Sequence, residues 1–121
     1  MAELKPIYLI SGDDDAKIDA WRGRVRARAE RELGPGGLEG FDGKVDGAGA
    51  VAGALAAMTF ATGTRYLLAE PVEGWKADDV AELEPSLQAM PPDTVLVLIA
   101  RGKAPAKLAK AVEKAGGEAR D

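Results

Sequence analysis

Short apolar runs alternate along the chain with segments in which apolar residues recur at helical spacing. The clearest runs are residues 7–10 and 94–100, and neither alternates with polar residues. Such runs are typical of parallel strands that are covered on both faces. The β-branched run at 94–100 is the strongest, so we expect it at the centre of a sheet. Weaker strands are expected at 38–43, at an edge, at 65–70, and in a short final segment at 118–121.

Four segments between these strands show helical spacing. Residues 13–33 form the longest, which ends at a Gly-Pro-Gly-Gly sequence, and its apolar face is Ile18, Trp21, Val25, Ala29 and Leu33. Residues 47–58 and 77–88 predict two shorter helices, and we expect Pro85 to kink or shorten the second. Pro105 suits the first position of a fourth helix, whose inward face is Leu108, Ala111, Val112 and Ala115.

The alternation of strands and helices predicts an α/β fold. It corresponds to a three-layer structure, with a parallel sheet of about five strands and helices on both faces. The 121 residues suffice for one domain with a real core, so we treat 1–121 as a single domain.

Composition excludes several classes of function. The chain contains no Cys and no His, which removes disulfides, Cys/His metal sites and the Ser-His-Asp triad. Its net charge of −4 argues against non-specific binding of nucleic acid. No apolar signal segment and no run long enough to span a membrane is present, so we expect a cytoplasmic protein without membrane contacts.

Charge is unevenly distributed. The third quarter is acidic, whereas the last helix is basic and carries Lys107, Lys110 and Lys114. The first helix carries five arginines: Arg22, Arg24, Arg26, Arg28 and Arg31. Two interpretations stay open for them, a solvated basic face that neighbouring glutamates balance and a docking surface for an acidic partner.

An acidic turn follows the first strand. Ser11 and Gly12 allow the chain to turn, and Asp13, Asp14 and Asp15 can then cap the first helix. A phosphate-binding loop at this place needs a glycine-rich sequence with Lys and Ser or Thr, which is missing. The alternative is a small Mg-dependent phosphoryl-transfer or receiver-like domain that uses Asp13 to Asp15, because Mg²⁺ prefers oxygen ligands.

A second segment of interest lies between the second helix and the third strand. Met58, Thr59, Phe60 and Ala61 precede a polar Thr-Gly-Thr loop. Met58 and Phe60 either close the core under the third strand or form an exposed apolar anchor for a partner's pocket. One aromatic residue can supply much of the energy of such a contact.

Several segments, in order, resemble one protein family. They are the strand and acidic turn at 7–14, Phe-Asp-Gly at 41–43, Ala-Met-Thr-Phe at 57–60 before the strand at 65–68, Pro-Pro-Asp-Thr at 91–94 before an apolar strand, and the helix at 107–116. Together they resemble the N-terminal domain of the delta subunit of the bacterial DNA polymerase III clamp loader.

The resemblance implies an AAA+-like domain with a degenerate phosphate loop, no catalysis and no bound cofactor. It implies that the domain binds the sliding clamp (the beta subunit) and helps to open it. It also implies that the domain works with other clamp-loader subunits and contacts DNA only indirectly, through the complex. The clamp-binding residues that carry over are Met58, Thr59, Phe60 and Ala61. The family often has two large apolar residues in tandem, whereas this chain has Ala61 at the second position. Delta subunits are longer, so the resemblance also implies that the chain is a fragment.

Overall fold

The computed structural model describes residues 5–57 and 63–120. Within these residues, five parallel strands form one sheet in the order β2-β3-β4-β1-β5. The strands are β1 (Ile7–Gly12), β2 (Leu38–Asp42), β3 (Arg65–Glu70), β4 (Thr94–Arg101) and β5 (Glu118–Arg120), and the helices are α1 (Asp15–Leu33), α2 (Gly47–Ala56), α3 (Ala77–Gln88) and α4 (Ala106–Lys114). The predicted three-layer α/β fold is confirmed, with β4 inside the sheet and β2 at an edge.

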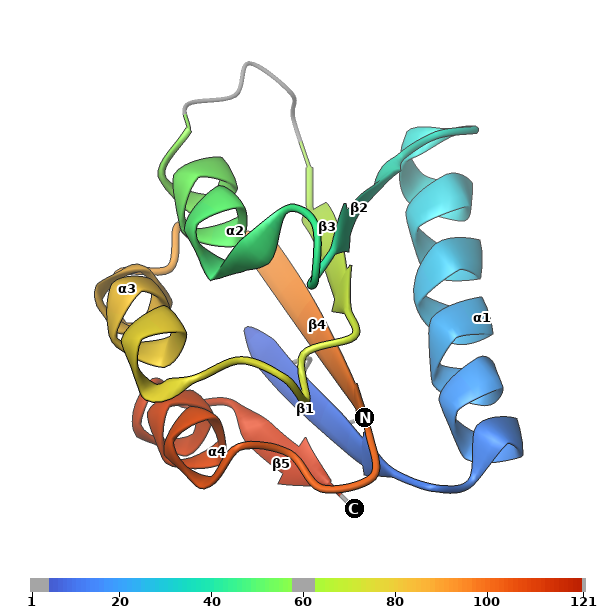
Figure 1. Ribbon diagram of the computed structural model, residues 1–121. Coiled ribbons are helices and arrows are strands. Elements are labelled where there is room, and N and C mark those ends of the chain that lie inside the picture. The colour runs from blue at the N-terminus through green and yellow to red at the C-terminus, as the bar shows by residue number, and fades with distance from the viewer. Residues whose placement is uncertain (1–4, 58–62, 121) are drawn as a thin grey trace.

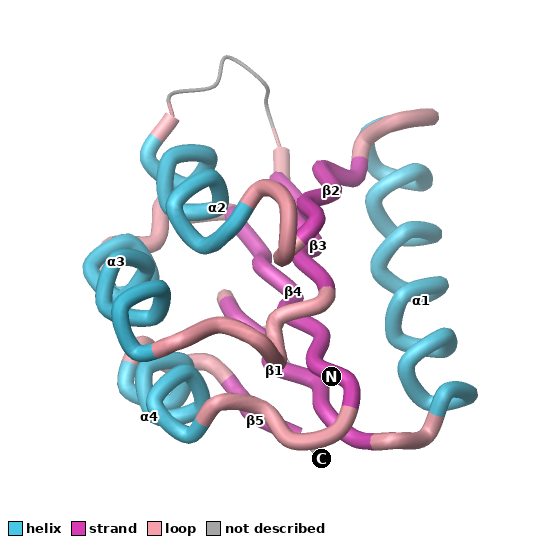
Figure 2. Tube along the Cα trace, viewed as in Figure 1, coloured by secondary structure: helices cyan, strands magenta, loops and turns pink. Residues whose placement is uncertain are grey.

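The helices cover the two faces of the sheet unequally. Among the described residues, α1 is the one helix on one face, while α2, α3 and α4 lie side by side on the other (Figure 1). Figure 2 shows the strands as a central layer between these two helical layers. No helix within the described residues is long and apolar enough to cross a lipid bilayer.

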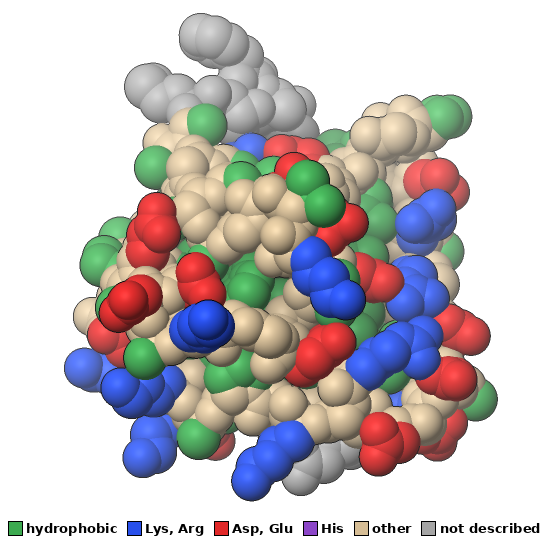
Figure 3. All heavy atoms as spheres, in the orientation of Figure 1, with side chains coloured by type: hydrophobic (Ala, Val, Ile, Leu, Met, Phe, Trp, Pro, Cys, Tyr) green, Lys and Arg blue, Asp and Glu red, His purple; other side chains and the backbone are tan. Residues whose placement is uncertain are grey.

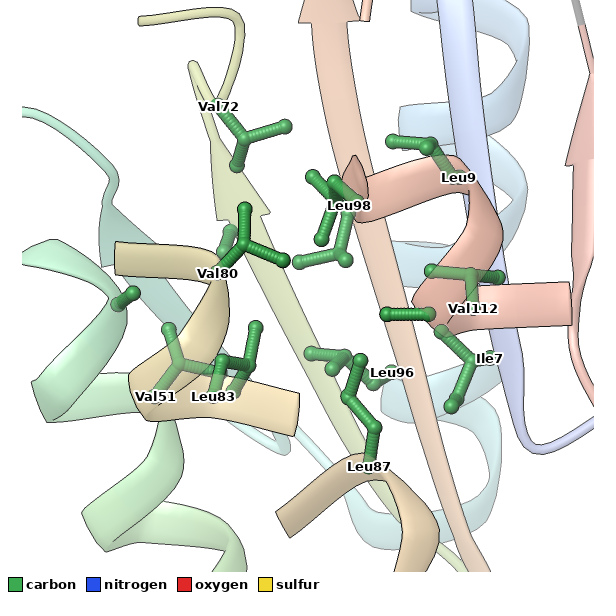
Figure 4. Packing of buried hydrophobic residues seen from close by; sticks show 14 of the residues in the cluster. Ile7, Leu9, Val51, Val72, Val80, Leu83, Leu87, Leu96, Leu98 and Val112 are labelled. Atoms are coloured by element: carbon green, nitrogen blue, oxygen red, sulfur yellow. The ribbon is translucent and has the colours of Figure 1, made fainter. Parts of the chain in front are cut away.

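Strand residues alternate between two apolar clusters, because successive side chains point to opposite faces of a sheet. The larger cluster joins strand residues such as Leu96 and Leu98 to α2, α3 and α4. Figure 4 shows Val51, Leu83 and Val112 of these helices directed towards the sheet. The smaller cluster lies under α1 and contains the intervening strand residues, among them Tyr8, Tyr66, Val95 and Val97.

Two predicted boundaries were wrong, and an expected effect of Pro85 is absent from α3, which spans Ala77–Gln88 as predicted. Ser11 and Gly12 were expected in a turn, but they continue β1 and pair with Ala100 and Arg101 of β4, so α1 begins only at Asp15. Helix α2 ends at Ala56 instead of residue 58. Pro85 does not shorten α3. Its ring lies on an exposed side of the last turn, where the carbonyl that loses its hydrogen bond can be solvated.

Candidate functional site

The residues predicted to bind a partner, Met58, Thr59, Phe60 and Ala61, lie outside the described residues. The described chain stops at Ala57, directly after α2, and resumes at Gly63, two residues before β3. The described residue Gly63 therefore lies close to the amino-terminal edge of the sheet, where β3 and β4 begin side by side.

Arg65, the first residue of β3, ties together the two ends of this segment. Its Nη1 donates a hydrogen bond of 2.7 Å to the carbonyl oxygen of Ala54 in the last turn of α2. Its Nε and Nη2 donate to the two carboxylate oxygens of Glu39 on β2, the latter at 2.7 Å. The side chain is only 16% exposed, and the hydrogen bond with Glu39 raises the pKa of Arg65, against the effect of burial. Arg65 thus fixes the end of α2 against the sheet.

The Pro-Pro-Asp-Thr sequence lies at the same edge. The backbone N–H of Arg65 donates to the carbonyl oxygen of Asp93 at 2.8 Å. Asp93 has a positive φ of 59° in the turn before β4, a conformation that Asp tolerates better than most residues. A cavity of about 460 Å³ opens here, and its wall includes Thr64, Met90 and residues 91–94. The Pro-Pro-Asp-Thr sequence and Arg65, which follows the segment at 58–62 in the chain, therefore adjoin one edge of the sheet.

The opposite, carboxyl-terminal edge is where open α/β sheets bind ligands, at the point where the strand order reverses. In this chain that point lies between β1 and β4. Gly12 and Gly102 bridge the two strand ends with two mutual backbone hydrogen bonds of 2.9 Å. Both have positive φ, 128° and 80°, which glycine adopts without strain. Their backbone N–H groups bond to each other's carbonyl groups instead of pointing towards an open crevice.

Two of the three aspartates after β1 have separate roles. Asp14 is the N-cap of α1 and accepts a hydrogen bond of 3.2 Å from the backbone N–H of Lys17. Asp15 forms an ion pair with Arg101 at the end of β4. The predicted capping of the helix is confirmed. Among residues 5–57 and 63–120, no group of three or more acidic, His or Cys side chains is placed to hold a metal ion.

Arginine and glutamate side chains occupy the rest of this edge. Arg22 of α1 pairs with Glu70 at the end of β3. Glu73 accepts a hydrogen bond of 3.0 Å from the backbone N–H of Arg101. Lys17 directs its Nζ to the carbonyl oxygen of Ser11 at 3.3 Å. Arg22 and Lys17 thus place their charges on a carboxylate and a carbonyl of the chain, and Glu73 accepts from a backbone N–H.

The charges on the helices follow the sequence. On the face shown in Figure 3, acidic side chains lie over α3 and basic ones over α4, while both kinds alternate along α1. Of the arginines on α1, Arg22 pairs with Asp19 and Glu70, and Arg28 pairs with Glu32. The basic face of α1 is therefore partly neutralised by the chain itself.

Sequence reasoning missed Arg65 and Trp21 as residues of interest. In the sequence, Arg65 resembles any charged residue at the start of a strand. The one signal that could have identified it is its position directly after the Thr-Gly-Thr loop. Trp21 fitted the apolar spacing of α1, but it is only half-buried. Comparison of the sequence with protein-family models and with curated proteins gives no match.

Proposed function

We propose that this chain is a non-catalytic clamp-loader domain, similar to the N-terminal domain of the bacterial delta subunit. In this proposal it binds the sliding clamp and helps to open it during DNA replication in the cytoplasm, together with other clamp-loader subunits. Contact with DNA is indirect, through the complex. The starting point is the order of the motifs that resemble the family, from the strand at 7–10 to the helix at 107–116.

The observation that carries the proposal is the fixation of both ends of the segment with Met58, Thr59, Phe60 and Ala61. Arg65 joins Ala54 at the end of α2 to Glu39 on β2, and its own backbone is bonded to Asp93. Recognition residues tend to lie on loops that a rigid scaffold positions. A fixed base lowers the entropy that such a loop loses on binding.

The carboxyl-terminal edge supports a role without nucleotide chemistry. Phosphate sites in such folds use free backbone N–H groups and a lysine. Here Gly12 and Gly102 bond to each other, and the edge carries Asp15, Glu70 and Glu73 in contacts with arginine side chains or backbone. We expect calorimetry with ATP and Mg²⁺ to give no saturable heat, and micromolar binding would contradict the non-catalytic part of the proposal.

The decisive test is a titration of the domain with a bacterial sliding clamp, paired with a thermal melt. Phe60→Ala should weaken binding by about 2 kcal/mol or more, as hot-spot aromatics do, with a nearly unchanged Tm. Val45→Ala is the matched control, because Val45 is an 81% exposed apolar residue after β2. If Phe60 is a core residue instead, its truncation should cost about 3–5 kcal/mol of stability. That result would exclude Phe60 as the anchor, and Met58→Ala would be tested next.

A further inference from the structure

A groove separates part of α1 from the sheet on the face that α1 covers. The cavity has a volume of about 220 Å³, and its floor is formed by Tyr8, Tyr66, Val95 and Val97 from three adjacent strands. Trp21 of α1 forms a wall, and its ring lies 5.3 Å from that of Tyr8. We call this cavity the α1 groove. It exists because the described chain places one helix on this face and three on the other.

Two guanidinium groups lie against the aromatic wall of the α1 groove, and a third lines the groove. Arg24 lies over the Trp21 ring at 4.9 Å, and Arg120 of β5 lies 5.3 Å from the same ring. The third, Arg28, lines the groove beside Arg24. Arg28 pairs with Glu32 and Arg120 with Glu118. Within the described residues, Arg24 has no carboxylate partner and makes a single hydrogen bond, of 3.4 Å, to the carbonyl oxygen of Ala20.

We propose that the α1 groove binds an acidic amphipathic segment of a partner protein. One large apolar side chain of that segment enters the groove and packs on Tyr8, Tyr66 and Val97. A neighbouring carboxylate accepts hydrogen bonds from the guanidinium of Arg24, whose planar fork suits a carboxylate. The groove is smaller than the roughly 300–1,000 Å³ of a small-molecule site, but it can admit a single side chain. The proposal does not depend on clamp binding by Met58 to Ala61.

The charge pattern favours a segment with few carboxylates over a nucleic-acid strand. Glu32 and Glu118 lie beside the arginines of the groove, each already paired. A single carboxylate can reach Arg24 and avoid both, whereas a strand with a phosphate at every nucleotide would pass close to them. The sequence left two interpretations of the basic face of α1, a solvated face and a docking surface. Our proposal retains the docking surface but limits it to Arg24 and the aromatic groove.

The test uses NMR of the ¹⁵N-labelled chain and two capped hexapeptides, Gly-Glu-Leu-Phe-Glu-Gly and Gly-Lys-Leu-Phe-Lys-Gly. The two tryptophans supply a signal and an internal control. Trp21 lies at the groove, whereas Trp75 is 7% exposed and donates its indole N–H to the carbonyl oxygen of Gly43 at 2.8 Å. The glutamate peptide should shift the Trp21 indole signal in a saturable way that weakens with salt. The Trp75 signal should stay in place.

Charge reversals on α1 separate the groove from general electrostatics. Arg24→Glu should weaken binding of the glutamate peptide about tenfold, equivalent to ~1.4 kcal/mol. Arg26→Glu makes the same change of charge on an exposed position that does not line the groove, and it should change binding less than twofold. An unchanged Trp75 signal verifies that each variant is folded, and Arg24→Gln replaces Arg24→Glu if it is not.

Several results would overturn the proposal. They are equal shifts from the glutamate and lysine peptides, equal losses in the two reversal variants, and no saturable shift of Trp21. A shift of Trp21 by an oligothymidylate but not by the peptide would assign the groove to single-stranded nucleic acid. If the Trp21 signal depends on protein concentration and does not respond to the peptide, the occupant of the groove is a second copy of the chain.

Discussion

The guanidinium of Arg22 in α1 donates two hydrogen bonds to the carboxylate of Glu70 at the end of β3, from Nε at 3.0 Å and from Nη2 at 2.6 Å. The two residues are 48 positions apart in the sequence, so the pair fixes α1 against the carboxyl-terminal edge of the sheet. The hydrogen bond to Glu70 is the main cause of a raised pKa of Arg22, against the opposing effect of burial.

A double-mutant cycle on Arg22 and Glu70 should show a favourable coupling. Both side chains are 29% exposed, so we expect a coupling of about 0.5–1 kcal/mol, at the upper end for surface pairs. The matched cycle on Arg22 and Asp19, whose side chain is 64% exposed, should give a value near zero. Urea denaturation of the single and double alanine variants measures both couplings. Equal couplings in the two cycles would mean that the bidentate geometry contributes nothing to stability.

Gly43 and Gly40 should respond in opposite ways to the same substitution. A Cβ atom at Gly43 would lie 1.9 Å from the carbonyl oxygen of Pro71, whereas one at Gly40 meets no atom within 4 Å. Gly43→Ala should therefore destabilise the fold by about 1–3 kcal/mol through overpacking. Gly40→Ala should be neutral or stabilise it by up to about 1 kcal/mol, because it restricts the unfolded chain. Denaturant midpoints at equal m-values compare the two, and similar losses would contradict the close approach at residue 43.

The regular elements could be predicted because their signals are local. The apolar run at 94–100 identified β4, and the Gly-Pro-Gly-Gly sequence after α1 marked its end at Leu33. The boundary at Ser11 and Gly12 was wrong because their strand conformation depends on pairing with Ala100 and Arg101, some 90 residues away. Secondary-structure propensity is a property of the local sequence and therefore does not report such long-range pairing.

The side-chain relationships at the candidate site could not be predicted. Arg65 meets Glu39 and Ala54 only because β2, α2 and β3 pack together. The α1 groove at Trp21 forms on the face of the sheet that α1 covers, while α2, α3 and α4 pack on the other face. Which helices cover which face follows from the order and connection of the strands. The capping by Asp14 was predictable, since a cap involves residues within one turn.

Tyr66 should make stability depend on pH in the alkaline range. Its hydroxyl donates to Glu32 at 2.9 Å and accepts from Nε of Arg28 at 3.0 Å. Burial, followed by the hydrogen bond to Glu32, raises the pKa of Tyr66 above its ordinary value of 10.0. Because the folded-state pKa exceeds the unfolded one, the folded state retains this proton more tightly. The stabilisation is therefore complete below pH 10.0 and is lost as pH rises through the folded pKa.

The variant Tyr66→Phe removes this titrating group while retaining the ring. We expect it to lose about 1 kcal/mol at neutral pH, typical of one hydrogen bond, and to show a smaller decline of stability above pH 10.0 than the unmodified chain. Tyr8→Phe is the control, since within the described residues the Tyr8 hydroxyl accepts one hydrogen bond, from the backbone N–H of Lys5, and contacts no charged side chain through it. Chemical denaturation at several pH values measures the difference. Parallel pH curves for Tyr66→Phe and the unmodified chain would contradict the role of Tyr66.

Arg65 should affect clamp binding without itself being the anchor. A lysine at this position cannot serve both carboxylate oxygens of Glu39 and the carbonyl oxygen of Ala54, because it lacks the planar fork of arginine. We expect Arg65→Lys to lower stability by about 1–2 kcal/mol through loss of charge-assisted hydrogen bonds. It should also weaken clamp binding several-fold, since the ends of the segment with Met58 to Ala61 are then less fixed. Arg26→Lys, at an exposed position on α1, should change neither quantity. Thermal melts measure the stability of the two variants, and clamp titrations measure their affinity. If Arg65→Lys loses stability but binds the clamp as tightly as the unmodified chain, Arg65 contributes to the fold and not to clamp binding.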